Sequence, residues 1–84
     1  MPPNNRPLPI SVSKIAQKAI ARMDADMRHR IKEAIGNLPA GDVKKLVGYT
    51  HSYRLRVNDL RVLFEMTDEI VVTNVLPRGD TYKK

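Results

Sequence analysis

The sequence has no cysteine, and its only histidines are His29 and His51. The lack of cysteine excludes disulfides and thiolate metal sites, and it permits a reducing compartment. Two well-separated imidazoles do not supply the ligands of a conventional zinc site. A chain of 84 residues also leaves little room for an internal cofactor cavity. We therefore expect a protein with no bound metal and no cofactor.

Long apolar runs are missing as well. No segment approaches the length that is needed to cross a membrane. The N-terminal segment 1–6, which is rich in proline and asparagine, lacks the apolar core of a signal peptide. We expect a cytoplasmic protein that has no membrane partner.

The chain has instead a basic character, with 15 lysines and arginines against 9 aspartates and glutamates and a net charge of +6. Such a surface attracts polyanions, although a net charge of this size can also serve solubility alone. The apolar fraction of 42% is enough for a single folded domain over residues 1–84. The placement of the charges must therefore decide between the two interpretations.

Residues 8–38 show the signals of one short strand and two helices. We expect residues 1–7 to form a disordered tail and residues 8–12 to form an edge strand, where Pro9 is tolerated. Ser13 can cap a first helix of about three turns, and Asp24 can cap a second helix that ends near Leu38. The apolar residues of the first helix recur at helical spacing: Ile15, Ala16, Ala19, Ile20 and Met23.

From residue 52 onward, apolar and polar residues alternate as they do in strands. Residues 39–48 are expected to form a linker with a turn-like stretch at 41–46. Turns at Asn58-Asp59 and at residues 67–69 separate three strands, and the last strand, at 70–76, is apolar enough for the sheet interior. The predicted fold is α+β in the order β-α-α-β-β-β. Its antiparallel sheet carries a helical hairpin on one face and leaves the other face open.

The segment 53–64 predicts a hairpin with an arginine-rich face. If Asn58-Asp59 is a two-residue loop, Arg56 lies opposite Arg61, and Arg54 shares their face. The pairs on the other face are then apolar: Leu55 with Val62, and Tyr53 with Phe64. Two opposed arginines destabilise a sheet, and a phosphate held by their guanidinium groups would explain them.

The alternative is a solvated arginine face with Glu65 as its counter-ion. Lys44 and Lys45 likewise either contact a nucleic-acid backbone or are solvated. Tyr49 and Tyr53 are expected to pack in the core or at its rim, and His51 to lie on the surface. The sequence contains no Gly-rich phosphate loop, paired-carboxylate site or nucleophile–base motif.

Five segments, in this order, carry a family resemblance: RIKEAI at 30–35, GDVKKLVG at 41–48, YRLRV at 53–57, LRVLFE at 60–65 and PRGDTYK at 77–83. Together they resemble the RelE-type toxins of the RelE/ParE superfamily. The resemblance covers residues 8–84, which is nearly the whole chain.

The resemblance implies the β-α-α-β-β-β fold and a RelB-like antitoxin as partner, with operator DNA bound only through the antitoxin complex. It implies that the protein cleaves mRNA in the A site of the ribosome and so inhibits translation. The reaction would need no metal: the ribose 2′-oxygen attacks the adjacent phosphate and leaves a 2′,3′-cyclic phosphate. By motif position, the implied catalytic residues are Arg54, Arg56, Arg61, Arg78 and Tyr82. As basic residues, Lys44, Lys45 and Lys83 are expected to bind RNA.

One departure from the family pattern affects the chemistry. The best-known members carry lysines where this chain has Arg54 and Arg56. An arginine side chain remains protonated and is a poor general base, but it can hold the phosphate and its developing charge. Tyr82 then becomes a candidate base, because nearby cations favour a phenolate, and Arg78 can stabilise or protonate the departing 5′-oxygen.

Two alternatives remain open at the level of sequence. One is a ParE-type toxin, which shares the fold but targets DNA gyrase. The other is an inactive member that only binds an antitoxin and operator DNA. The presence of both Arg78 and Tyr82 beside the strand arginines favours the RNA-cleaving activity.

Overall fold

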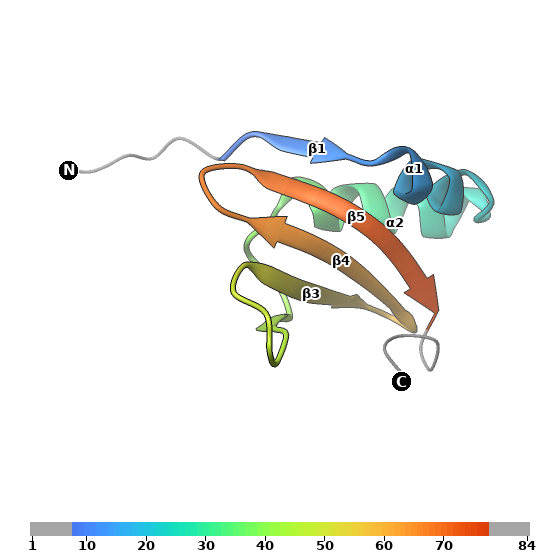
Figure 1. The fold of residues 1–84 in the computed structure, drawn as a ribbon. Helices are drawn as coiled ribbons and strands as arrows, with labels where there is room; N and C mark the ends of the chain where they lie inside the picture. Colours follow the sequence, from blue (N-terminus) through green and yellow to red (C-terminus); the bar gives the residue numbers. More distant parts are fainter. Residues whose placement is uncertain (1–7, 78–84) are drawn as a thin grey trace.

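The computed structural model describes residues 8–77, which form two helices and five strands (Figure 1). The elements follow in the order β1 (Ile10–Val12), α1 (Lys14–Ala21), α2 (Ala25–Gly36), β2 (Val43–Lys45), β3 (Ser52–Val57), β4 (Leu60–Met66) and β5 (Ile70–Pro77). The predicted α+β class is confirmed. The expected disordered tail at 1–7 lies outside the described residues, as do Arg78, Tyr82 and Lys83.

The strands form one sheet in the order β1-β5-β4-β3-β2. The meander β2-β3-β4-β5 is antiparallel, but β1 pairs with β5 in parallel, with Ile10 opposite Ile70. The expectation of a wholly antiparallel sheet was therefore wrong. The meander fixes the direction of β5, whereas the direction of β1 depends on how the chain returns through both helices to the opposite edge of the sheet.

β2 is a strand that the sequence did not reveal, since its residues were expected to form part of a linker. It has only three residues, and two of them are lysines, so the alternation is too short to recognise. Val43 pairs with Leu55 and Lys45 pairs with Tyr53. β2 forms because β3 offers an unpaired edge. This pairing depends on the tertiary structure and not on the local sequence.

Both predicted helix caps are confirmed. The Ser13 hydroxyl accepts a hydrogen bond from the Ala16 amide at 3.1 Å, and the Asp24 carboxylate accepts one from the Met27 amide at 3.1 Å. α1 is shorter than the expected three turns, because Asp24 starts the next helix only three residues after Ala21. Ile15 was expected on the apolar face of this helix, but it is 65% exposed.

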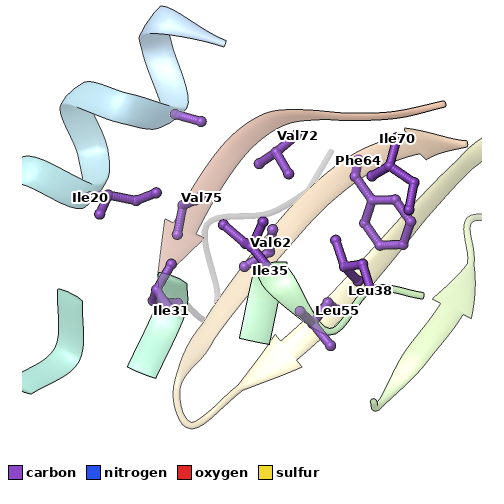
Figure 2. Close-up of a cluster of buried hydrophobic side chains, with 11 residues drawn as sticks. Ile20, Ile31, Ile35, Leu38, Leu55, Val62, Phe64, Ile70, Val72 and Val75 are labelled. Atoms are coloured by element: carbon purple, nitrogen blue, oxygen red, sulfur yellow. The ribbon is translucent and has the colours of Figure 1, made fainter. Parts of the chain in front are cut away.

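The core lies between the helices and one face of the sheet (Figure 2). Its fully buried large side chains come from α2, β4 and β5: Ile31, Val62, Phe64, Ile70 and Val72. Burial of each such side chain contributes about 1.5–3 kcal/mol. Neither helix of the described region is long and apolar enough to cross a membrane.

Gly41 connects the helical layer to β2 in a backbone conformation with φ +115°. Side chains rarely adopt this conformation. A Cβ at this position would also lie 2.9 Å from Cδ1 of the buried Leu55. The glycine therefore allows the chain to pass directly over the core before it enters the edge strand.

Candidate functional site: a cationic sheet face

The hairpin of β3 and β4 has the predicted register throughout. Val57 pairs with Leu60, Arg56 with Arg61, and Tyr53 with Phe64. Asn58, at the first position of the two-residue turn, has φ 53°, which suits the left-handed turns that join twisted strands. The helix-facing residues of this hairpin contribute to the core, so the arginines lie on the open face.

Four cations occupy neighbouring positions on this open face: Lys44, Arg54, Arg56 and Arg61. We call this set the cationic face. Lys44 pairs with Arg54 across β2 and β3, and Arg56 pairs with Arg61 across β3 and β4. Like charges in directly opposed positions of a sheet are destabilising, so the arrangement is expected to attract an anionic ligand.

Arg61 is the half-buried cation of this set that has no compensating partner among residues 8–77. Its residue is half-buried, and within residues 8–77 its guanidinium has no hydrogen bond or ion pair. Its neighbours across the sheet are Arg56 on β3 and Leu76 on β5. A partly desolvated guanidinium group between another arginine and a leucine is well placed to bind a phosphate in a bidentate manner.

Asp42 is a residue of this site that sequence reasoning missed. Its carboxylate lies 4.0 Å from the Arg56 guanidinium, and its carbonyl oxygen accepts a 3.0 Å hydrogen bond from the Arg56 amide. The same carbonyl accepts a long 3.5 Å hydrogen bond from Arg54. The side chains of the ion pair are 51% and 52% exposed, so the pair contributes little stability and leaves Arg56 available to a ligand.

Glu65 was expected as the counter-ion if the face were merely solvated. In the part of the chain that the structure describes, Glu65 forms no ion pair, and Asp42 has that role for Arg56 instead. The sequence signal for Asp42 was its position directly after Gly41. That signal becomes readable only once β2 is known to pair with β3.

The other candidate residues have different positions. Lys44 shares the side of Arg54, whereas Lys45 lies in the alternate row with Tyr53. Tyr53 stacks on Phe64, with ring centroids 5.6 Å apart, which confirms that it has a packing role. His51 is exposed as expected. Tyr49 was expected to pack, but it is 61% exposed in the loop between β2 and β3.

The described chain ends beside the start of β4, close to Arg61 of the cationic face. Pro77, the last residue of β5, pairs with Leu60, which precedes Arg61. The expected roles of Arg78, Tyr82 and Lys83 fall beyond that point, so they remain predictions. Among residues 8–77, no three or more histidines, aspartates or glutamates gather into a group that would hold a metal ion.

The arrangement defines a class of protein: a small α+β domain with helices on one sheet face and arginines on the other. Comparison with solved structures agrees with this class. The RelB–RelE antitoxin–toxin complex from Methanococcus jannaschii contains a chain that is 31% identical, with a TM-score of 0.71. The match covers 84% of this chain and 93% of that chain.

Two more distant structures show the fold alone. A chain of the RelBE2 toxin–antitoxin complex from Mycobacterium tuberculosis is 19% identical with a TM-score of 0.75, and the match covers 92% of this chain and 98% of that one. The isolated RelE toxin from E. coli is 13% identical with a TM-score of 0.72, and the match covers 90% and 89% of the two chains. Comparisons with protein-family models and with curated proteins find no match.

The chain belongs to the RelE family of toxins, on the strength of the archaeal match and its coverage of both chains. The fold and the family that the sequence motifs predicted are thereby confirmed.

Proposed function

We propose that this protein is the toxin of a type II toxin–antitoxin system and that it inhibits translation by cleaving mRNA in the A site of the ribosome. The observation that carries the proposal is the cationic face, in which Arg56 and Arg61 oppose one another and Arg61 has no partner among the described residues. This face is on the side of the sheet that the helices do not cover. Its charge and its guanidinium geometry suit the phosphate of a single-stranded RNA.

The proposed reaction is an attack by the ribose 2′-oxygen on the adjacent phosphorus. A bond forms between the 2′-oxygen and phosphorus, and the bond from phosphorus to the 5′-oxygen breaks. The guanidinium groups of Arg54, Arg56 and Arg61 stabilise the charge that develops on the pentacovalent phosphate. In this proposal Tyr82 accepts the proton of the 2′-hydroxyl, and Arg78 stabilises or protonates the departing 5′-oxygen.

The chemistry of the product ends tests this reaction. Ribosomes carrying a defined mRNA should yield fragments with a 2′,3′-cyclic phosphate and a 5′-hydroxyl. A 2′-deoxy nucleotide at the cut site should stop cleavage while binding persists. Fragments that end in a 3′-hydroxyl and a 5′-phosphate would overturn the mechanism, as would cleavage of the 2′-deoxy mRNA.

A cellular experiment tests the target. Induced expression should stop bulk protein synthesis while DNA supercoiling stays normal. A supercoiling defect with translation intact would indicate a gyrase-directed activity of the ParE type instead. An absence of both effects would indicate a member that only binds its antitoxin.

The proposed partner is a RelB-like antitoxin with an acidic segment. The solved complexes from Methanococcus jannaschii and Mycobacterium tuberculosis each pair a toxin with an antitoxin. In this chain the cationic face would attract a segment of opposite charge. Co-expression with the adjacent open reading frame should yield a complex and restore growth, and a small acidic protein that leaves the toxicity unchanged would count against this pairing.

A further inference from the structure

A concavity of about 550 Å³ lies on the open face of the sheet, directly beside the cationic face. Its floor comes from the strands and includes Leu63 of β4 and, two residues further along the same strand, Glu65. Its wall comes from the loop between β2 and β3, which is yellow-green in Figure 1 and carries Val47 and Tyr49. Among residues 8–77, no helix residue lines this concavity.

The wall presents apolar side chains to solvent. Tyr49 is 61% exposed and Val47 is 95% exposed. Between them, Gly48 has φ +86°, and the Tyr49 amide donates a 3.3 Å hydrogen bond to the Leu46 carbonyl, which closes the turn. An exposed aromatic ring on a hydrogen-bonded turn is a surface on which a nucleobase can stack.

The concavity and the cationic face share two side chains, Lys44 and Arg54. Arg54 pairs across the hairpin with Leu63, which is two residues beyond Arg61 on β4. That step along a strand corresponds to roughly 7 Å. A phosphate bound between Arg54 and Arg61 would therefore place the base of an adjoining nucleotide over Leu63, within the concavity.

A bulge in β5 gives the floor its shape. Leu63 pairs with Asn74 whereas Phe64 pairs with Val72, so Thr73 is an additional residue opposite β4. The Thr73 hydroxyl donates a 3.2 Å hydrogen bond to the Leu63 carbonyl, and Thr73 lines the concavity. Bulges bend a strand locally and are common beside binding sites.

Glu65 lies at the end of the concavity away from the arginines, opposite Ser52 on β3. Its carboxylate has no ion pair among residues 8–77. A carboxylate accepts hydrogen bonds from the exocyclic amino group of a base, with cytosine as the usual partner. Uracil presents a carbonyl oxygen in the place of that amino group.

We propose that this concavity is a nucleobase pocket in which Tyr49 stacks on the base next to the bound phosphate and Glu65 selects a base with an exocyclic amino group. The inference rests on the proposed function in taking RNA as the ligand. It adds a specificity site that the cationic face alone does not contain. The carboxylate of Glu65, which has no ion pair among residues 8–77, would repel an acidic antitoxin segment, whereas it can accept a hydrogen bond from the amino group of a base.

Direct binding tests the pocket without relying on cleavage. The probe is a short single-stranded RNA with methylated 2′-oxygens, which cannot be cut, together with an abasic version that has the same phosphates. The full chain should bind the RNA that carries bases about tenfold more tightly than the abasic one, which is near the lower end of what one base–aromatic stack provides. The backbone amide signals of Tyr49, Leu63 and Glu65 should shift only with the RNA that carries bases.

Variants assign the two roles. Tyr49→Leu should lose about tenfold in affinity for the RNA that carries bases and nothing for the abasic RNA, whereas Tyr49→Phe should retain the affinity. Glu65→Gln should bring the ratio of the affinities for cytosine-containing and uracil-containing RNA towards one. Ile15→Ala is the matched control, because Ile15 is equally exposed but lies on α1, away from the pocket.

Equal affinity of the protein for abasic RNA and for RNA that carries bases would overturn the pocket while leaving the proposed cleavage intact. Unchanged binding by Tyr49→Leu would also overturn it. Amide shifts at Tyr49 and Leu63 that arise only with an acidic antitoxin peptide would assign the concavity to the antitoxin instead. Base-dependent binding by a chain that cuts no RNA would support the pocket and count against the cleavage proposal.

Discussion

The two faces of the β3–β4 hairpin differ completely although they are built from alternating residues of the same two strands. On the helix side, Leu55, Val62 and Phe64 are almost wholly buried. On the open side, one residue along, the same strands present Arg54, Arg56 and Arg61. Because successive side chains of a strand point to opposite faces, one face can supply stability while the other binds a ligand, and mutations should separate the two.

The largest expected effect is on the covered face. Phe64→Ala removes a side chain that is 1% exposed and that stacks with Tyr53. It should lower the free energy of unfolding by about 3–5 kcal/mol, as measured by urea or thermal denaturation. Any loss of toxicity should follow the loss of folded protein. A Phe64→Ala protein with unchanged stability would show that the covered face is not the one that supplies stability.

The converse effect is expected at Arg61 on the open face. Arg61→Ala removes a cation that faces Arg56, so the melting temperature should stay the same or rise. The rate of cleavage should fall by an amount that corresponds to about 2.7–4 kcal/mol of lost transition-state stabilisation. Growth inhibition should be lost as a result. Exposed Arg30, which pairs with Asp26 on α2, provides the control, since Arg30→Ala should remain toxic. A fully active Arg61→Ala protein would count against the arginine site.

Gly41 connects the helical layer to β2, and its replacement tests whether β2 completes the site on the open face. Gly41→Ala would bring a Cβ within 2.9 Å of Leu55 Cδ1 at φ +115°. The strain should cost about 1–3 kcal/mol of stability, measured by denaturation. The amide signals of Val43–Lys45 should also shift, because β2 follows directly. Unaltered stability would mean that this turn adjusts freely.

The smallest effect is expected at Asp42. Asp42→Ala removes a half-exposed ion pair with Arg56 but retains the backbone hydrogen bonds of the same residue. Stability should change by less than about 1 kcal/mol. Affinity for RNA at low ionic strength should increase modestly, because a competing carboxylate is gone, and the gain should shrink in added salt. Weaker RNA binding would indicate that Asp42 positions Arg56 rather than competes for it.

The sequence alone was sufficient for the features that depend on local interactions. A two-residue turn and strict alternation determine which residues of the hairpin face each other, so Arg54, Arg56 and Arg61 could be placed together correctly. Ser13 and Asp24 could be recognised as caps because a cap acts on amides three residues away. Arg78 and Tyr82 were proposed from the family resemblance, and their roles stay predictions.

Tertiary structure decided the features that depend on pairing between distant segments. β2 is a strand only because the edge of β3 is available, and that pairing brings Lys44 and Asp42 to the arginines. β1 is parallel to β5 because the intervening chain crosses through both helices. The exposure of Tyr49 and the concavity beside it follow from the loop that β2 creates. Each of these contacts joins residues whose proximity no local propensity encodes, so the amino-acid pattern specified the cationic hairpin while long-range packing built the rest of the site around it.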